Sequence, residues 1–343
     1  MYLISFGTRP ELIKLIPLIN KFKELNFTFK TLFTGQHENL IKEFYKYIDK
    51  PDFIFDNIME HGQTLNELSS KILLSSNKLF KENVFSNIIV QGDTTSAYLL
   101  ALSAFHFNIP VIHLEAGLRT NNKYSPFPEE MNRRFISQIA KIHLCPTLIS
   151  IENLKKEQIT DNIYLVGNTV VDIYKSILEN TVPSDKIKEI INNNKDYILV
   201  TLHRRENRGK KMYSMWEQLK SLSDRYKFIY ITHPSLPESK KILDNNNIIL
   251  LDPINYENMV HLVSNSKGII TDSGGLQEEV VCVNKRVLIC RDTTERQETV
   301  NCGLGKLIDT HIIENIKFFD EDLINIIDNP YGNDVCEKII DVL

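Results

Sequence analysis

Acidic side chains and one histidine directly follow apolar runs of the chain, where they could exchange protons with a bound molecule. Asp93 follows IIVQG, Glu115 follows VIHL, His203 follows ILVTL, and Glu129 opens the polar segment EEMNRR. Carboxylates and imidazoles are the side chains that most often serve as general acids and bases. We therefore interpret Asp93, Glu115, Glu129 and His203 as candidate catalytic residues.

Each of these residues also has a structural alternative, which the sequence leaves open. Asp93 could cap a helix, Glu129 could be a first-turn acid, and His203 could begin a helix. Asp93, Glu115 and a histidine could together bind a metal ion, but the chain has no HExxH motif and no histidine pair spaced i, i+4. We expect no metal site and no cofactor.

The segment GTRPE, residues 7–11, carries groups suited to an anionic ligand. It joins an apolar run to a helix that we expect to begin near Pro10, and helix N-termini attract anions. Arg9 and Lys14 could reach a phosphate there, and Arg133 is a further candidate near the carboxylates. The alternative for Arg9 is a contact with a neighbouring strand.

The segment TDSGGLQEE, residues 271–279, is the strongest single motif of the chain. Ser273, Gly274 and Gly275 open a predicted helix, where N–H groups unobstructed by a Cβ atom can approach a diphosphate closely. Glu278 and Glu279 lie one turn further, and a carboxylate there could accept hydrogen bonds from a ribose. An ordinary helix cap at Ser273 is the alternative.

Asp93, Glu115, His203 and Ser273 lie just beyond short apolar runs, and these runs alternate with longer amphipathic stretches. The runs cover residues 2–6, 28–33, 87–91, 110–114, 142–145 and 163–166, and then 197–201, 227–231, 247–251, 268–271 and 286–289. Continuous apolar runs predict strands that are buried on both faces, and the alternation with helices predicts parallel sheets. In such sheets ligands bind beyond the carboxyl ends of the strands.

The α/β pattern runs twice, which together with a length of 343 residues predicts two domains. The stretch 181–195 is polar and lacks a buried strand, so we place the boundary near residues 170–180. The tail after NPYG predicts a turn and an amphipathic helix.

The charge, the cysteines and the lengths of the apolar runs argue against several classes of protein. The net charge is −4, with no basic arm, so we expect no nucleic-acid partner. The five cysteines form no CxxC pair, which argues against disulfides and zinc. The first residues lack the basic region and long apolar run of a signal peptide, and no apolar run reaches the length of a membrane span, so we expect a cytoplasmic protein with no membrane partner.

The order of motifs resembles that of the non-hydrolysing UDP-N-acetylglucosamine 2-epimerases. The matching segments are GTRPE, TGQH, QGDTTSA, HLEAGLRT, SPFPEEMNR, GNTVVD, LHRREN, DSGGLQEE, RDTTERQE and NPYG, and they extend from residue 3 to about residue 336. The resemblance implies a GT-B-type fold of two Rossmann-like, doubly wound domains with a cleft between them. Residues 1–172 would form the first domain, residues 173–328 the UDP-binding domain, and residues 329–343 a helix that crosses back to the first.

The resemblance also implies an activity and roles for residues. It implies interconversion of UDP-GlcNAc and UDP-ManNAc by a homodimer that supplies ManNAc for cell-surface polysaccharide. Asp93, Glu115, Glu129 and His203 match catalytic positions. The residues that match phosphate-side positions of the family are Arg9, His203, Ser273, Gly274 and Gly275. Glu279 matches a ribose-binding carboxylate. Gln36 and His37 match a second, activating site.

Departures from the family pattern leave other functions open. VVCVNKR stands at 280–286 where APSLGKP is common, and RQE stands at 296–298 in place of RPE. The alternatives are a 2-epimerase of another UDP-2-acetamido sugar, a hydrolysing 2-epimerase that releases ManNAc and UDP, a glycosyltransferase of the same fold, and an inactive UDP-sugar sensor. The intact acid–base set argues against the sensor.

Overall fold

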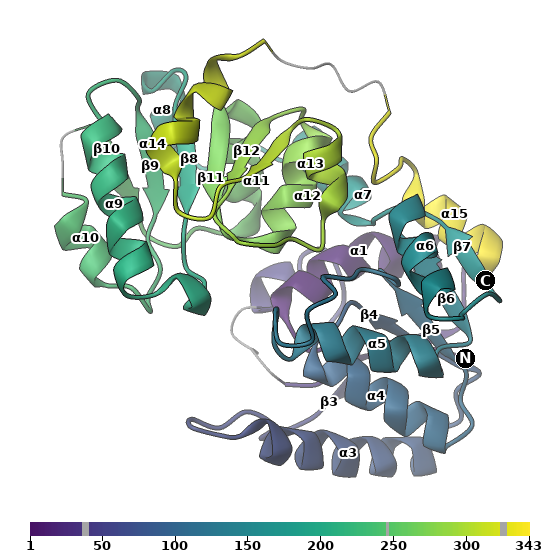
Figure 1. Cartoon of the computed structure of the whole chain (residues 1–343). Coiled ribbons are helices and arrows are strands. Elements are labelled where there is room, and N and C mark those ends of the chain that lie inside the picture. Colours follow the sequence, from purple (N-terminus) through teal and green to yellow (C-terminus); the bar gives the residue numbers. More distant parts are fainter. Residues whose placement is uncertain (36–40, 245–246, 323–327) are drawn as a thin grey trace. The chain divides into compact units, whose positions relative to one another are not determined.

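A computed structural model describes residues 1–35, 41–244, 247–322 and 328–343. The chain divides into two compact units (Figure 1). The first comprises Met1–Ile173 together with Tyr331–Leu343, and the second comprises Tyr174–Pro330. Each unit contains one parallel sheet with helices packed against it.

The sheet of the first unit has seven strands in the order β3-β2-β1-β4-β5-β6-β7. The strands are β1 (Tyr2–Phe6), β2 (Phe29–Phe33), β3 (Phe53–Ile54), β4 (Asn87–Gln91), β5 (Val111–Leu114), β6 (Ile142–Cys145) and β7 (Ile163–Leu165). Every neighbouring pair is parallel. Six of these strands lie where apolar runs predict them, and only the two-residue edge strand β3 was not predicted.

Helices cover this sheet and form its core. They are α1 (Arg9–Glu24), α3 (Leu65–Glu82), α4 (Thr95–His106), α5 (Glu129–Ile139), α6 (Leu148–Lys156), the first residues of α7 (Val170–Asn180), and α15 (Val335–Val342). In Figure 1, α3, α4 and α5 lie side by side in one layer. Leu79, Leu100 and Ile136 from these helices pack with Leu3 and Val90 of the sheet in one buried cluster.

The C-terminal helix α15 belongs to the first unit. Its first backbone N–H groups, at Val335 and Cys336, donate to the Asp172 carboxylate at 3.1 and 2.8 Å. Lys21 of α1 pairs with Glu337 at 2.6 Å. A carboxylate at a helix N-terminus satisfies orphan donors and complements the helix dipole, so Asp172 caps a helix more than 160 residues further along the chain.

The sheet of the second unit has six parallel strands in the order β10-β9-β8-β11-β12-β13. They are β8 (Ile198–Thr201), β9 (Phe228–Ile231), β10 (Ile248–Leu251), β11 (Gly268–Thr271), β12 (Arg286–Ile289) and β13 (Gly305–Leu307). The helices are the remainder of α7, α8 (Asp185–Asn193), α9 (Lys210–Leu222), α10 (Glu238–Ile242), α11 (Tyr256–Asn265), α12 (Gly274–Cys282), α13 (Gln297–Asn301) and α14 (Ile312–Asn315). Trp216 of α9 is fully buried and donates from Nε1 to the Tyr230 hydroxyl at 3.0 Å.

In both sheets the strand order reverses once, between β1 and β4 and between β8 and β11. At such a reversal the loops after the two strands lead to opposite faces of the sheet and leave a crevice, which is where open α/β sheets bind ligands. The loop after β4 contains Asp93, and the loops after β8 and β11 contain His203 and Ser273. The predicted fold class, two doubly wound parallel sheets, is confirmed.

Candidate functional site

Asp93 lies in the tight turn that follows β4. Gly92 has a positive φ of 68°, which glycine adopts at little cost, and its N–H donates to the Leu114 carbonyl at 3.0 Å. Nε2 of His113 lies 2.8 Å from the Gly92 carbonyl oxygen. Burial lowers the pKa of His113 to about 3, so the ring is neutral and Nε2–H donates. The turn is therefore fixed from β5, the neighbouring strand.

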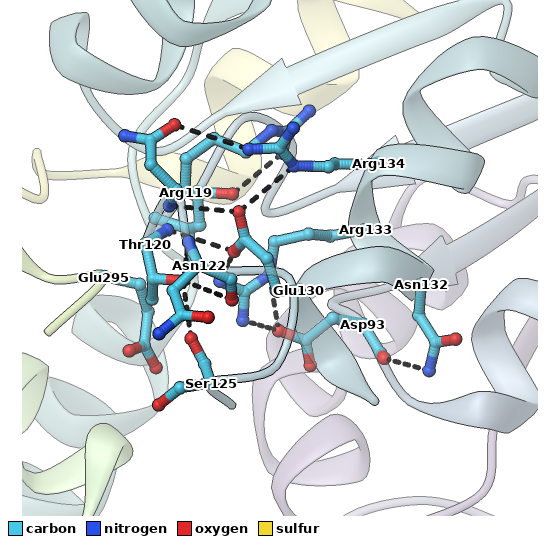
Figure 2. Close-up of polar contacts among 12 residues, drawn as sticks. Asp93, Arg119, Thr120, Asn122, Ser125, Glu130, Asn132, Arg133, Arg134 and Glu295 are labelled. Atoms are coloured by element: carbon cyan, nitrogen blue, oxygen red, sulfur yellow. Dashed lines mark hydrogen bonds and ion pairs between the residues drawn. The ribbon is translucent and has the colours of Figure 1, made fainter. Parts of the chain in front are cut away.

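The Asp93 carboxylate is held by Arg133 of α5 (Figure 2). Both Nε, at 3.0 Å, and Nη2 of Arg133 donate to Oδ2. Asn132 fixes the backbone of the same residue by donating to the Asp93 carbonyl at 2.9 Å. Oδ1 accepts no hydrogen bond from the residues that the structure describes, and a quarter of the side chain is exposed. One carboxylate oxygen is thus anchored while the other is presented.

Glu115 comes directly after β5 and has an unusual backbone conformation. Its φ is +67°, in the left-handed region that non-glycine residues seldom adopt outside constrained sites. Nζ of Lys14 lies 2.9 Å from both carboxylate oxygens, and the Gln91 amide donates to Oε2. A Cβ atom built on Gly92 would stand 3.8 Å from Glu115 Oε2. The turns that carry Asp93 and Glu115 are therefore neighbours.

Glu129 is the first residue of α5 and is half-buried. The next residue, Glu130, is fully buried and accepts hydrogen bonds from the backbone N–H groups of Thr120 and Asn121. The loop between Glu115 and α5 is thereby tied to the helix that bears Glu129.

The turn after β1 differs from the simple anion site that the sequence predicts. The Glu11 carboxylate accepts the N–H groups of Gly7 and Thr8 at 3.0 and 2.7 Å, and the Thr94 hydroxyl at 2.8 Å. These two N–H groups are therefore already satisfied within the protein. Arg9 remains partly exposed, and its nearest charged partner is Glu43 at 3.9 Å.

In the second unit, His203 is positioned by the carboxylate of Asp272. The backbone N–H groups of His203 and Arg204 donate to Asp272 at 3.0 and 2.9 Å, and Nδ1 of His203 lies 3.4 Å from Oδ1. The His203 ring stacks on that of His233, with centroids 5.3 Å apart. Asp272 is fully buried, whereas the His203 side chain is 39% exposed. The imidazole is held from one side and open on the other.

The two glycines at the start of α12 differ in their surroundings. A Cβ atom on Gly274 would stand 2.8 Å from Nη1 of Arg296, so a larger residue there would have to displace the Arg296 side chain. A Cβ atom on Gly275 would meet only Glu279 Oε1, at 3.9 Å. Ser273 holds the N-cap position but makes no side-chain capping bond. The helix start is thus open at Gly275, beside Glu279, which accepts a hydrogen bond from the Tyr256 hydroxyl at 3.3 Å.

The segment RDTTERQE folds back onto α12 through buried charges. Arg296 donates from Nε to Glu278 at 2.9 Å and also pairs with Glu295. Arg291 donates to Glu295 at 3.0 Å, and the Thr294 hydroxyl donates to Gln277 at 2.6 Å. These contacts fix the segment against the first turns of the helix that carries the double glycine.

The structure brings the predicted residues together in part. Asp93 contacts Arg133, and Glu115 contacts Lys14 and lies beside the Asp93 turn. His203, Ser273, Gly274, Gly275 and Glu279 share one region of the second unit. Gln36 and His37 lie outside the described residues. Over residues 1–35, 41–244, 247–322 and 328–343, no cluster of three or more His, Cys, Asp or Glu side chains could hold a metal ion.

No role was predicted for Glu11, Glu130 or Asp272, whose carboxylates hold the turns and loops that carry the candidate residues. Each of them carries a signal in the sequence. Glu130 has arginines three and four residues later, on one helix face, and Asp272 directly follows the central strand β11 as the first residue of DSGG. Glu11 stands at the fourth position of a capping box that begins at Thr8.

A family model described as UDP-N-acetylglucosamine 2-epimerase matches residues 20–343. The chain belongs to the UDP-N-acetylglucosamine 2-epimerase family. A UDP-N-acetylglucosamine 2-epimerase of Campylobacter jejuni is 39% identical and covers 99% of this chain and 96% of its own length. The crystal structure of a UDP-GlcNAc 2-epimerase from Neisseria meningitidis, bound to UDP-GlcNAc, is 34% identical. It has a TM-score of 0.89 and covers 99% of this chain and 98% of its own.

Membership of this epimerase family accords with the fold. A glycosyltransferase structure from Streptomyces nogalater, 12% identical, matches with a TM-score of 0.60 over 99% of this chain and 92% of its own. At that identity the likeness concerns the fold alone, and it supports the GT-B-type architecture. None of the described helices is long and apolar enough to cross a membrane.

Proposed function

We propose that the protein is a non-hydrolysing UDP-GlcNAc 2-epimerase that interconverts UDP-GlcNAc and UDP-ManNAc. The observation that carries the proposal is the pair of adjacent turns after β4 and β5. Each presents a carboxylate, Asp93 or Glu115, fixed by a buried cation from another helix. Fixed carboxylates with restricted freedom are what proton transfer at a defined carbon requires.

The chemistry follows from the weak acidity of the C2 proton, which has no adjacent carbonyl group. A base removes this proton while the C1–O bond breaks, so that UDP leaves with the bonding electron pair and a C1–C2 double bond forms in 2-acetamidoglucal. UDP then re-adds to C1 while a proton is delivered to the opposite face of C2. We assign the acid–base steps to Asp93, Glu115, Glu129 and His203, without dividing the two faces among them.

The second unit would hold the nucleotide. The open space at Gly275, the uncommitted capping position of Ser273 and the nearby Glu279 support a diphosphate at the start of α12 and a ribose at Glu279. The exposed face of His203 would complete the leaving-group side. On the family resemblance we also propose Arg9 as a phosphate-side residue. Lys14 and Arg133 would act chiefly through Glu115 and Asp93, because their donors reach these carboxylates.

The substrate proposal is UDP-GlcNAc and not another UDP-2-acetamido sugar. Of the residues that depart from the family pattern, Val280 and Val281 are buried in α12, and Gln297 donates to the Thr294 carbonyl at 2.7 Å. These changes therefore affect packing behind the helix start. On the family resemblance we further propose a cytoplasmic homodimer that supplies ManNAc for cell-surface polysaccharide.

The test is incubation with UDP-GlcNAc in heavy water, followed by NMR. The proposal expects deuterium at C2 and the appearance of UDP-ManNAc. Free ManNAc with UDP would instead identify a hydrolysing enzyme. Unchanged substrate without exchange at C2 would refute the proposal and leave a glycosyltransferase or an epimerase of another sugar.

Asp93→Asn provides the matched residue test. It should abolish exchange at C2 while UDP still binds, because the proposed UDP contacts lie elsewhere. The control is Asp49→Asn, which removes an exposed carboxylate that pairs with Lys23 at the surface and should leave turnover unchanged.

A further inference from the structure

Glu130 is a buried carboxylate with four donors converging on it (Figure 2). It is fully inaccessible to solvent. The donors are the backbone N–H of Thr120 at 3.0 Å, the backbone N–H of Asn121 at 3.2 Å, Nη1 of Arg133 at 3.1 Å and Nε of Arg134 at 3.2 Å. A carboxylate so enclosed cannot touch a substrate, so any effect it has on the reaction passes through its partners.

One of these partners, Arg133, connects Glu130 to Asp93. Nη1 donates to Glu130 Oε2, while Nε and Nη2 donate to Asp93 Oδ2. A guanidinium is a planar group whose N–H donors are fixed relative to one another. Fixing one edge of the Arg133 guanidinium against Glu130 therefore fixes the direction in which the other edge meets Asp93.

We infer that Glu130 is a positioning residue for the epimerisation, acting on Asp93 through Arg133. Glu130 sets the plane of the guanidinium, the guanidinium occupies Oδ2 of Asp93, and Oδ1 is thereby left facing the substrate. The inference rests on the proposed role of Asp93 as an acid–base residue. It assigns a task in the reaction to a carboxylate that is not itself a proton donor or acceptor.

A different role for Glu130 would be to anchor the loop that begins at Thr120, with no effect on Asp93. The two roles differ in how substitutions combine. If Glu130 acts through Arg133, removing Arg133 first removes the effect of Glu130, because residues acting in series are not additive. If Glu130 acts only on the loop, the two effects multiply.

The experiment compares Glu130→Gln with Glu157→Gln. Glu157 is a matched control, because it accepts two hydrogen bonds from Arg119 at 2.8 and 2.7 Å in the same cluster but none from Arg133. We expect Glu130→Gln to lower kcat roughly 10-fold to 100-fold, with KM for UDP-GlcNAc unchanged within about threefold. Glu157→Gln should change kcat less than about threefold, since Glu157 pairs with Arg119 and Arg134 and neither guanidinium contacts Asp93.

The decisive measurement is the double variant with Arg133→Gln. Relative to Arg133→Gln alone, adding Glu130→Gln should change kcat less than about twofold, whereas multiplied effects would overturn the inference. Full activity of Glu130→Gln in an otherwise active enzyme would overturn it as well. Absence of C2 exchange in the unsubstituted protein would refute the proposed function first.

Circular dichroism and UDP affinity report whether each variant is folded. If Glu130→Gln does not fold, Glu130→Asp takes its place, because it keeps the charge but is one methylene too short to hold Arg133 and the loop together. It should lower kcat without changing UDP affinity, and unchanged kcat would contradict the inference.

Discussion

Lys14 and Glu115 form a symmetric ion pair across 101 residues of sequence, with the ammonium 2.9 Å from each carboxylate oxygen. Both side chains are less than one-tenth exposed. Lys14 lies in α1 and Glu115 at the end of β5, so the pair joins a helix to the turn that presents a proposed acid–base residue. A buried pair of this kind holds geometry more than it adds net stability.

The first prediction separates these two effects. Lys14→Met should leave Glu115 as an uncompensated buried charge and lower the free energy of unfolding by about 3–5 kcal/mol. The double variant Lys14→Met with Glu115→Gln removes both charges, so most of that stability should return. Both variants should lack epimerase activity, because Glu115 is displaced in the first and neutral in the second. Urea unfolding and the C2-exchange assay measure the two quantities.

Lys21→Met serves as the control, because Lys21 lies on the same helix and pairs with Glu24 and Glu337 near the surface. It should lower stability far less than Lys14→Met does, because exposed ion pairs contribute little, and it should leave activity intact. If the double variant were as unstable as Lys14→Met, lost packing of the lysine stem would explain the effect better than an unpaired charge.

The sequence predicts strands such as β4 and β11 with the bounds that the structure has. Their residues are buried on both faces, so each strand is a continuous apolar run. The edge strands β3 and β13 were not predicted, because they are not buried on both faces and so lack a continuous apolar run. Phe53–Ile54 and Gly305–Leu307 are short and partly exposed, and neither contains an apolar run long enough to predict a strand.

Pairing between side chains was not predictable from single positions. The sequence places Asp93, Glu115 and His203 just after apolar runs that predict strands. Because parallel strands of one sheet end at a common edge, each residue was expected at the ligand-binding edge of its sheet. It gives no sign that Asp272 holds the backbone of His203, since that contact spans 69 residues. The resemblance to the family proposes roles for residues, while the three-dimensional contacts identify which cation faces which carboxylate.

The second prediction concerns the two glycines of α12. Gly275→Ala should leave thermal stability unchanged or slightly raised, because the added Cβ meets only ordinary contact and alanine favours helix. It should weaken UDP binding at least about tenfold, because the methyl group would occupy the space that we assign to the diphosphate. Calorimetric titration with UDP and a thermal melt measure both effects.

Gly274→Ala is the internal comparison. Its Cβ would press on Arg296, which is held by Glu278 and Glu295, so thermal stability should fall. Undiminished UDP affinity in Gly275→Ala would show that no ligand group approaches the helix start at that position.

The last prediction follows from Glu11 at the turn after β1. Burial raises the pKa of Glu11 from 4.5 to about 7, and the hydrogen bonds from Thr8, Thr94 and Gly7 only partly oppose this effect. Between these two pH values the folded protein binds a proton that the unfolded chain has lost. Folding stability from this group is therefore complete below about pH 4.5 and is lost as pH rises toward 7, by an amount on the order of 3 kcal/mol. Glu11→Gln should remove this slope when the urea midpoint is measured from pH 5 to pH 8.

Glu67 supplies a matched control, because it occupies the equivalent capping-box position of α3 but is exposed. The backbone N–H of Thr64 donates to Glu67 and lowers its pKa. The sign is therefore opposite: its stabilisation is present above about pH 4.5 and is lost as pH falls. Glu67→Gln should leave the slope between pH 5 and pH 8 unchanged. If Glu11→Gln also left it unchanged, the buried Glu11 carboxyl would be ionised across this range. The Glu11 carboxylate that accepts the N–H groups of the turn carrying Arg9 would then be fully negatively charged at neutral pH.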